Sequence, residues 1–314
     1  MKIKDSLYLK FIDYGLELAS SIPRHFSKFS KKIYNNQQHV VLLVLKQKLK
    51  VTYRDLIEWI KINEPVRLML GLSRVPHHTT LVKFAKRIKP KLLNLLLPFR
   101  KAKHVAVDAT GFELEEKSYY YRTIWNSNRR QKTRRFMKLS IAVDTDKQRI
   151  LTYKIRKSRA HDTRDFELLL RDIKADYVLA DKGYASRKNR TFVYTIINAI
   201  PQIPFKKCSS KSGYYQRKAA KDFNEKIYHQ RSKIETIFGV IKKKYGSILR
   251  ARNITTQKIE LITKLIAYNI DRKSILTTLL IRGFQQSPFT LCCLLYTSDA
   301  ADELDGVDLG GRRI

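Results

Sequence analysis

The fold predicted for this chain is decided by two segments, HVAVDATGF (104–112) and YVLADKGY (177–184). In each, a short run of apolar residues is followed at once by an aspartate, Asp108 in the first and Asp181 in the second. Apolar runs of this length are typical of buried strands. An acid at the end of such a strand is partly desolvated and needs a cation beside it. Because strand ends line the functional crevice of an open α/β sheet, Asp108 and Asp181 are the first candidate site residues.

The residues around these two strands predict a mixed α/β sheet flanked by helices. Further strands are predicted at 119–125, 138–143, 150–155 and 202–205, and helices at 165–173 and 223–245. Pro204 restricts the last of these strands to the edge of the sheet, because proline lacks a backbone N–H. His161 and Asp162 precede the first helix, and a helix cap is favoured over a place beside a metal site.

The helix predicted at 223–245, which Gly246 ends, carries a third acid within a group of polar residues. This group consists of Tyr228, Arg231, Glu235 and Lys242. At about 100° per residue its members fall within an arc of roughly 60°. An apolar stripe lies roughly 90° away and consists of Ile227, Ile234, Ile237, Phe238 and Ile241. Taken alone, the polar group favours an ordinary solvated face with an Arg231–Glu235 pair.

A family resemblance gives the polar group another meaning. The spacing Tyr228-x2-Arg231-x3-Glu235-x6-Lys242, preceded by VDATGF and ADKGY, resembles the DDE transposases of prokaryotic insertion sequences. It is similar in particular to the groups that have a Tyr-Arg-Glu-Lys signature around the catalytic glutamate. The resemblance covers roughly residues 40–272.

The resemblance implies an RNase H-like catalytic domain and a metal site. In this family Asp108, Asp181 and Glu235 correspond to the three catalytic acids, which hold two Mg²⁺ ions, with Mn²⁺ as an alternative. Two hard cations about 4 Å apart activate the attacking oxygen and stabilise the leaving oxygen of a phosphodiester. Mg²⁺ prefers oxygen ligands and keeps several waters, so three carboxylates suffice. We expect Asp108 to bridge the ions and the other two acids to hold one each.

The resemblance also implies partners and a reaction. Arg231 and Lys242 are expected to grip phosphates near the end of a mobile element, and Tyr228 to contact DNA or to pack within the protein. The expected substrates are terminal inverted repeats and a target duplex, cleaved and joined through 3′-OH strand transfer by a homodimer that pairs two ends. Two alternatives remain. One is a catalytically silent or domesticated sequence-specific DNA-binding protein, and the other is a metal-dependent DNA endonuclease without strand transfer.

The charge of the chain favours a polyanionic partner. Lys and Arg number 64 against 28 Asp and Glu, which gives a formal net charge of +36. An enzyme of small metabolites has no need of such self-repulsion, whereas nucleic acid matches it. Aromatic and basic residues alternate over 118–138, as suits a distorted or unpaired DNA end, although a solvated basic hairpin is the alternative. The candidate DNA-binding residues of this segment are Arg122, Arg129, Arg130, Arg134 and Arg135.

Residues 1–100 predict short helices joined by tight turns. Thr52 and Asp55 have the spacing of a capping box, Pro65 is suited to begin the next helix, and Gly71 to end it. The following helix is expected to bury Leu81, Phe84 and Ile88 and to expose Lys83, Lys86 and Arg87. A basic outer face of this kind fits a helix-turn-helix DNA reader, and it fits a plain helical bundle equally well.

These features divide the chain into four parts. We expect a helical DNA-binding domain at 1–100, an RNase H-like catalytic domain at 101–272, a helical end at 273–286 and a tail at 287–314. The tail has five acidic and two basic residues and resembles the conceptual translation of sequencing-adapter DNA. We expect it not to be native, a genuine acidic tail being the alternative, and without it the net charge rises to +39.

The sequence gives no sign of a membrane partner or of a secreted protein. Its apolar runs are far shorter than the about 20 residues that cross a bilayer, and its start does not resemble a signal peptide. Cys208, Cys292 and Cys293 form neither a metal motif nor a disulfide framework. A cytoplasmic, nucleoid-associated protein is therefore expected.

Overall fold

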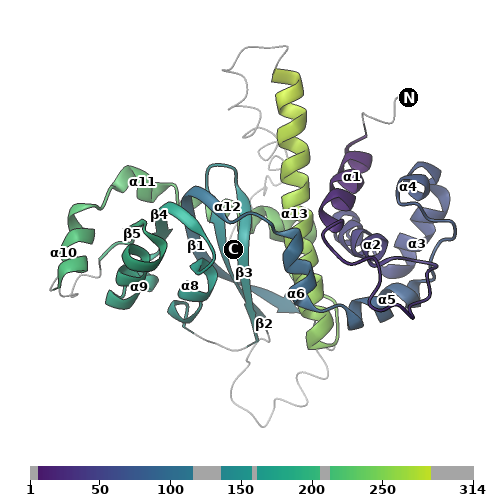
Figure 1. Cartoon of the computed structure of the whole chain (residues 1–314), viewed down its shortest axis with the longest axis horizontal. Coiled ribbons are helices and arrows are strands. Elements are labelled where there is room, and N and C mark those ends of the chain that lie inside the picture. Colours follow the sequence, from purple (N-terminus) through teal and green to yellow (C-terminus); the bar gives the residue numbers. More distant parts are fainter. Residues whose placement is uncertain (1–5, 116–135, 158–160, 206–212, 284–314) are drawn as a thin grey trace, which may run out of the picture. The chain divides into compact units, whose positions relative to one another are not determined.

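The computed structural model describes residues 6–115, 136–157, 161–205 and 213–283, with side chains described as far as residue 275 (Figure 1). The chain divides into two compact units, Met1–Ile270 and Asp271–Ile314. The second unit is described only over 271–283, the end of the last helix. None of the helices in the described ranges is long and apolar enough to cross a bilayer. The predicted tail at 287–314 and the predicted strand at 119–125 lie outside the described residues.

The first unit contains a mixed sheet, as predicted, with the strand order β3-β2-β1-β4-β5. Its strands are β1 (Lys101–Leu114), β2 (Phe136–Asp144), β3 (Arg149–Arg156), β4 (Lys174–Ala180), β5 (Ile200–Gln202) and β6 (Ile248–Leu249). The first three are antiparallel, whereas β4 is parallel to both β1 and β5. The short β6 pairs with the far end of β1. The edge position of β5 agrees with the prediction, although the strand lies at 200–202 and ends before Pro204.

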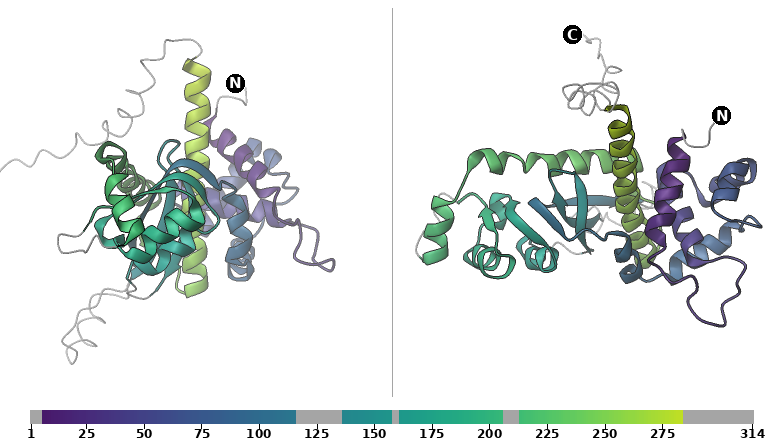
Figure 2. Two further views of the ribbon diagram at one scale, coloured as in Figure 1. Left: turned by 60° about the vertical axis from the view of Figure 1, so that its left-hand side comes forward. Right: turned by 45° about the horizontal axis from the view of Figure 1, so that its top comes forward.

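Helices cover both faces of this sheet (Figure 2). One face carries α8 (Thr163–Leu170) and α9 (Arg187–Phe192), followed by a π-helix at Val193–Ile197. The other face carries α12 (Ser232–Tyr245) and the first part of α13 (Ile254–Gly283). Three short elements follow β4 and β5: a 3₁₀ turn (Lys182–Tyr184), α10 (Tyr214–Lys221) and α11 (Glu225–His229). The observed architecture is that of an RNase H-like fold, a mixed sheet between helical layers.

The part of the chain before the sheet is all helical. Its elements are α1 (Leu7–Ala19), α2 (Asn36–Leu49), α3 (Tyr53–Ile62), α4 (Glu64–Met69), α5 (His78–Arg87), α6 (Pro90–Leu93) and a 3₁₀ turn at Asn94–Leu96. The Thr52–Asp55 capping box is confirmed, because each side chain bonds the backbone N–H of the other. Pro65 lies in the first turn of α4, and Gly71 follows the helix with a φ of +61° that favours glycine.

The two faces of α5 are as predicted. Leu81, Phe84 and Ile88 are buried, while Lys83, Lys86 and Arg87 are exposed. A basic exposed face fits a DNA reader and a plain helical bundle alike, so the DNA-reading role of α5 stays a prediction.

The single helix predicted at 223–245 is wrong, since the structure has two helices, α11 and α12, separated at 230–231. Two bonds explain the break. The Ser232 hydroxyl donates to the His229 carbonyl at 2.9 Å, a local bond that competes with the helical ladder. The Arg231 N–H bonds the Tyr228 carbonyl with the tighter i→i−3 spacing. Gly246, with a φ of +87°, ends α12 as predicted.

The buried histidine of α2 makes the stability of the protein depend on pH. His39 is 6% exposed, stacks on Phe84 with ring centres 4.7 Å apart, and its Nε2 has no partner in the described structure. Burial lowers the pKa of His39 to about 4. Below pH 6.5 the unfolded chain therefore binds a proton that the folded chain does not. We expect the free energy of unfolding to fall by about 3 kcal/mol from this group between pH 6.5 and pH 4.

Denaturant titrations at several pH values check this expectation. The variant His39→Leu should lose this part of the pH dependence, whereas the exposed His229→Leu should keep it. An unchanged slope of stability against pH in His39→Leu would contradict the assignment.

Candidate active site

Asp108 and Asp181 occupy equivalent places on two parallel neighbouring strands. In the register of β1 and β4, Val107 pairs with Ala180, so the two aspartates hold the next position on each chain. Side chains alternate between the faces of a sheet. Val107 belongs to the core under α8 and α9, and Asp108 therefore lies on the opposite face, which α12 covers. The sequence predicted Asp108 at the end of a strand. This is wrong, because β1 continues past Asp108 to Leu114 and the acid lies within the strand.

The third acid reaches the same face from α12. Its apolar residues Ile234, Ile237, Phe238 and Ile241 are buried against the sheet, as predicted. This packing leaves Glu235 exposed in the first turn of the helix. Arg231 joins the acids: its Nη1 is 3.5 Å from Asp108 Oδ2, and its Nη2 is 2.7 Å from Glu235 Oε1. One guanidinium thus bridges the first and third acids.

The charges of the other two acids act on the Asp108 carboxyl. Burial raises the pKa of the Asp108 carboxyl, and the charges of Asp181 and Glu235 raise it further. The Ala109 N–H, which donates to Asp108 Oδ1 at 2.8 Å, and the Arg231 guanidinium act in the opposite direction. Burial is the largest of these causes, and the net shift of the Asp108 pKa is upward.

The other two residues of the predicted polar group lie on either side of this bridge. Lys242 Nζ donates to Thr110 Oγ1 at 2.7 Å, and Thr110 is two residues from Asp108 on the same face of β1. Tyr228 lies in α11, before the break, and its ring contacts Phe223. Burial opposes the charge of Arg231, but Glu235, Tyr228 and Asp108 together raise its pKa.

The donor set suits a hard divalent cation, although the carboxylates are not gathered around one point. Within the described ranges, no group of three or more His, Cys, Asp or Glu side chains is arranged to hold a metal ion. Arg231 instead lies between Asp108 and Glu235 and contacts one oxygen of each. All three candidate ligands are carboxylates, the oxygen donors that Mg²⁺ prefers.

A second pair of acids, Asp162 and Asp165, lies on the face of the sheet opposite α12, and each forms an ion pair with a basic side chain. Asp165 is fully buried, accepts from Ser140 Oγ at 3.0 Å and pairs with Arg156 Nε at 2.6 Å. Asp162 stands at the start of α8 but makes no capping bond, since its carboxylate pairs with Lys138. His161 Nδ1 instead lies 3.4 Å from the Thr163 N–H. Neither Lys138 nor Thr110 was predicted from the sequence, because only the strand register shows what they face.

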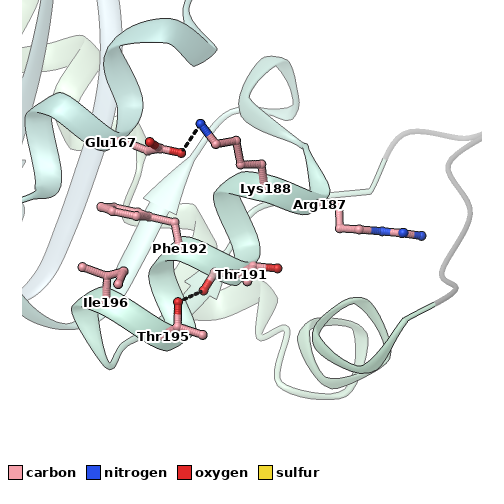
Figure 3. A pocket seen from close by; sticks show the side chains of 7 residues that line it. All are labelled: Glu167, Arg187, Lys188, Thr191, Phe192, Thr195 and Ile196. Atoms are coloured by element: carbon pink, nitrogen blue, oxygen red, sulfur yellow. Dashed lines mark hydrogen bonds and ion pairs between the residues drawn. The ribbon is translucent and has the colours of Figure 1, made fainter.

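The candidate residues Arg122, Arg129, Arg130, Arg134 and Arg135 are outside the described residues. The pocket in Figure 3 is lined by α8, α9 and the π-helix, with a Lys188–Glu167 ion pair of 2.9 Å at its side. Because none of Asp108, Asp181 and Glu235 lines it, this pocket is not the candidate active site.

Comparison with known proteins decides the family. A family model described as "Transposase DDE domain" matches residues 100–270, more than half of the chain. The chain belongs to the DDE transposase family. A search of the solved structures gave a likeness to the cryo-EM structure of a piggyBac transposase synaptic complex with hairpin DNA. It has 9% sequence identity and a TM-score of 0.46, and covers 99% of this chain and 85% of that one. No curated protein matches the chain.

The matched range of this DDE transposase contains all three candidate acids and the Arg231 that links two of them. Family membership confirms the expected class, a DNA-cleaving transposase, and implies dependence on divalent metal ions, typically Mg²⁺. The Tyr-Arg-Glu-Lys signature and the roles of the single residues stay predictions.

Proposed function

We propose that this DDE transposase belongs to a prokaryotic insertion sequence of the Tyr-Arg-Glu-Lys group. It cleaves DNA at the terminal inverted repeats of its element and joins the 3′-OH ends to a target duplex. The observations that carry this proposal lie within the range that matches the family. Asp108 and Asp181 follow paired residues of β1 and β4, and Arg231 joins Asp108 to Glu235.

The three acids are the proposed metal ligands and catalytic residues. Two divalent cations, when bound, activate the attacking oxygen and stabilise the leaving oxygen. Asp108 suits the bridging role because it lies on the central strand between the charges of Asp181 and Glu235. The donor set supports the fit, since all three side chains are carboxylates, whose oxygens Mg²⁺ prefers.

The proposed DNA-binding residues at the site include Arg231, which precedes α12, and Lys242 within it. The planar guanidinium of Arg231 can donate two hydrogen bonds to one phosphate. Lys242 supplies a single positive charge, whose position is fixed by its hydrogen bond to Thr110. Tyr228 is half-buried near Arg231, and its proposed role is to contact the same strand of DNA.

Other parts of the chain are proposed to bind the rest of the DNA. The helical domain at 1–100 reads the terminal repeats through the basic face of α5, and the catalytic domain extends over 101–272. The arginines of 118–138 contact the DNA end, and 273–286 is a helical end that precedes the tail. A homodimer, acting in the cytoplasm on nucleoid DNA, holds the two ends together, since synapsis needs two active sites.

An end-cleavage assay tests this function. The full chain is incubated with Mg²⁺ and a duplex that carries the inverted repeats flanking its reading frame, with a scrambled duplex as control. Nicking at the repeat together with a joined product is expected. Nicking without joining would favour the endonuclease, and a shifted but uncut duplex would favour the DNA-binding protein.

DNA binding should depend steeply on salt. Each phosphate contact releases condensed counterions, so the logarithm of the binding constant falls by about 0.9 per contact for each unit of log salt. Replacing Lys83, Lys86 and Arg87 together with glutamine should lower this slope by about 2 to 3. Replacing Lys188, which pairs with Glu167 in the pocket of Figure 3, should leave it unchanged. Fluorescence anisotropy between 50 and about 300 mM salt measures the slope, and equal slopes in wild type and the triple variant would exclude α5 from the interface.

A further inference from the structure

The loop between α1 and α2, residues 20–35, exposes apolar side chains among basic ones. Phe29 is 85% exposed, and Phe26 and Ile33 on either side of it are exposed as well. The loop also exposes four basic residues, which are Arg24, Lys28, Lys31 and Lys32. No acidic residue stands between Glu17 and Asp55 in the sequence. The loop therefore contains no carboxylate that could neutralise its cations.

Hydrogen bonds fix this loop at its base and at its tip. At the base, the Asn36 N–H donates to the Arg24 carbonyl at 2.7 Å, and Asn36 Nδ2 donates to the Pro23 carbonyl at 3.0 Å. At the tip, the Phe29 N–H donates to Ser27 Oγ at 3.1 Å. The exposed phenylalanine is thus presented by a turn of defined shape, and little ordering is needed when a partner binds.

The loop adjoins the basic face of α5. The rings of Phe26 and Phe84 lie with their centres 5.7 Å apart. The Arg87 guanidinium lies 5.7 Å from the centre of the Phe26 ring. Arg87 belongs to the exposed basic face of α5, together with Lys83 and Lys86. The basic side chains of the loop and of α5 are therefore neighbouring parts of one surface of the helical domain.

The chemistry of the loop suits duplex DNA. Basic side chains contact phosphates, and an apolar side chain can enter the minor groove, separate two base steps and kink the duplex. An anionic membrane also attracts basic loops with aromatic residues, but the chain belongs to a family of DNA-cleaving enzymes. A second copy of the chain is disfavoured as the partner, because its net charge of +36 repels the same cations.

We propose that the loop 20–35 is a second DNA-binding element of the helical domain, which inserts Phe29 into the minor groove next to the segment that α5 contacts and kinks the duplex. The inference rests on the proposed function, which assigns the terminal repeats to α5. Lys31 and Lys32 contact phosphates beside the insertion. Lys28 Nζ lies 5.1 Å from the centre of the Phe29 ring and contacts the phosphate nearest to it. Because flexible pyrimidine–purine steps kink most easily, the loop adds a preference for such a step.

Two measurements in EDTA test the inference on the full chain and the terminal-repeat duplex. Fluorescence anisotropy gives the affinity and its salt dependence, and energy transfer between dyes at the two ends of the duplex reports the kink. The wild type should raise the energy transfer on binding, because a kink brings the ends closer. Phe29→Ala should lose most of this rise and bind about tenfold more weakly, with an unchanged salt slope.

Charge and insertion should be separable. Replacing Lys31 and Lys32 together with glutamine should lower the slope of log binding constant against log salt by about 2 and keep the kink. Ile62→Ala is the matched control for Phe29→Ala. Ile62 is 81% exposed in the same domain but stands between Glu58 and Glu64 in the sequence, so this variant should keep the wild-type affinity and energy transfer. All three variants should melt like the wild type, because the altered side chains are exposed.

Wild-type affinity and energy transfer in Phe29→Ala would overturn the inference. Binding to phosphatidylserine vesicles that needs Phe29, with DNA binding unchanged, would assign the loop to a membrane instead, and a dimer lost in Phe29→Ala without effect on DNA would assign it to a second copy. A wild type that kinks the repeat through Phe29 but never cleaves it with Mg²⁺ would overturn the proposed function and leave the loop its role. Equal binding of the repeat and a scrambled duplex would overturn both.

Discussion

Replacing any one of the three acids by its amide is expected to reduce DNA cleavage by about a thousandfold or more. The variants are Asp108→Asn, Asp181→Asn and Glu235→Gln. An amide keeps the shape of the side chain but lacks the charge that holds a divalent cation, and metal-ion catalysis supplies several kcal/mol of transition-state stabilisation. Single-turnover cleavage of a duplex with the terminal repeat measures the loss.

Binding and folding should survive these changes. Removing one negative charge from a protein with a net charge of +36 slightly favours DNA binding, so a gel shift in EDTA should show equal or higher affinity. Asp176→Asn is the matched control, since it makes the same change at an exposed position of β4, the strand that leads to Asp181. Cleavage within tenfold of the wild type in any of the three site variants would rule out a three-acid site.

The sequence predicted the sheet because its strands are marked by composition. Runs such as 104–107 and 177–180 are apolar on both faces, as is expected for strands covered by helices on each side. The same runs placed Asp181 correctly at the end of its strand, whereas Asp108 lies within β1. The N-terminal helices were predicted because their caps are local: Thr52 and Asp55 meet through three residues of chain.

The parts that the sequence did not predict depend on contacts between distant segments. Helical periodicity could not locate the break at 230–231, because it depends on two local bonds, from Ser232 to His229 and from Arg231 to Tyr228. The spacing of the helix taken alone favoured an isolated Arg231–Glu235 pair, whereas the structure adds Asp108 from β1. The Tyr184 hydroxyl has no hydrogen-bond partner among the described residues, and this is likewise visible only when the burial of the turn Lys182–Tyr184 is known.

Arg231→Gln is expected to bind Mn²⁺ more tightly than the wild type and yet cleave DNA about a hundredfold more slowly. The two effects have one cause. In the metal-free protein the guanidinium competes with metal ions for Asp108 and Glu235, so its removal leaves both carboxylates free to bind a cation. The same group is the proposed grip on the DNA phosphate, and the loss of a charged two-point contact is worth about 3 kcal/mol.

Arg231→Lys should keep the charge but not the fork, so its cleavage should lie between those of the wild type and the glutamine variant. Lys243→Gln controls for the loss of one positive charge, because Lys243 is an exposed residue of the same helix. If Arg231→Gln bound Mn²⁺ less tightly than the wild type, the guanidinium would be a support for the metal-binding arrangement. If it cleaved DNA as fast as Lys243→Gln, the phosphate grip would have to come from elsewhere. The expected combination requires that Arg231 contacts both the carboxylates and the DNA phosphate. If it contacted only the carboxylates, its loss would change Mn²⁺ affinity alone, and if it contacted only the phosphate, its loss would change the cleavage rate alone.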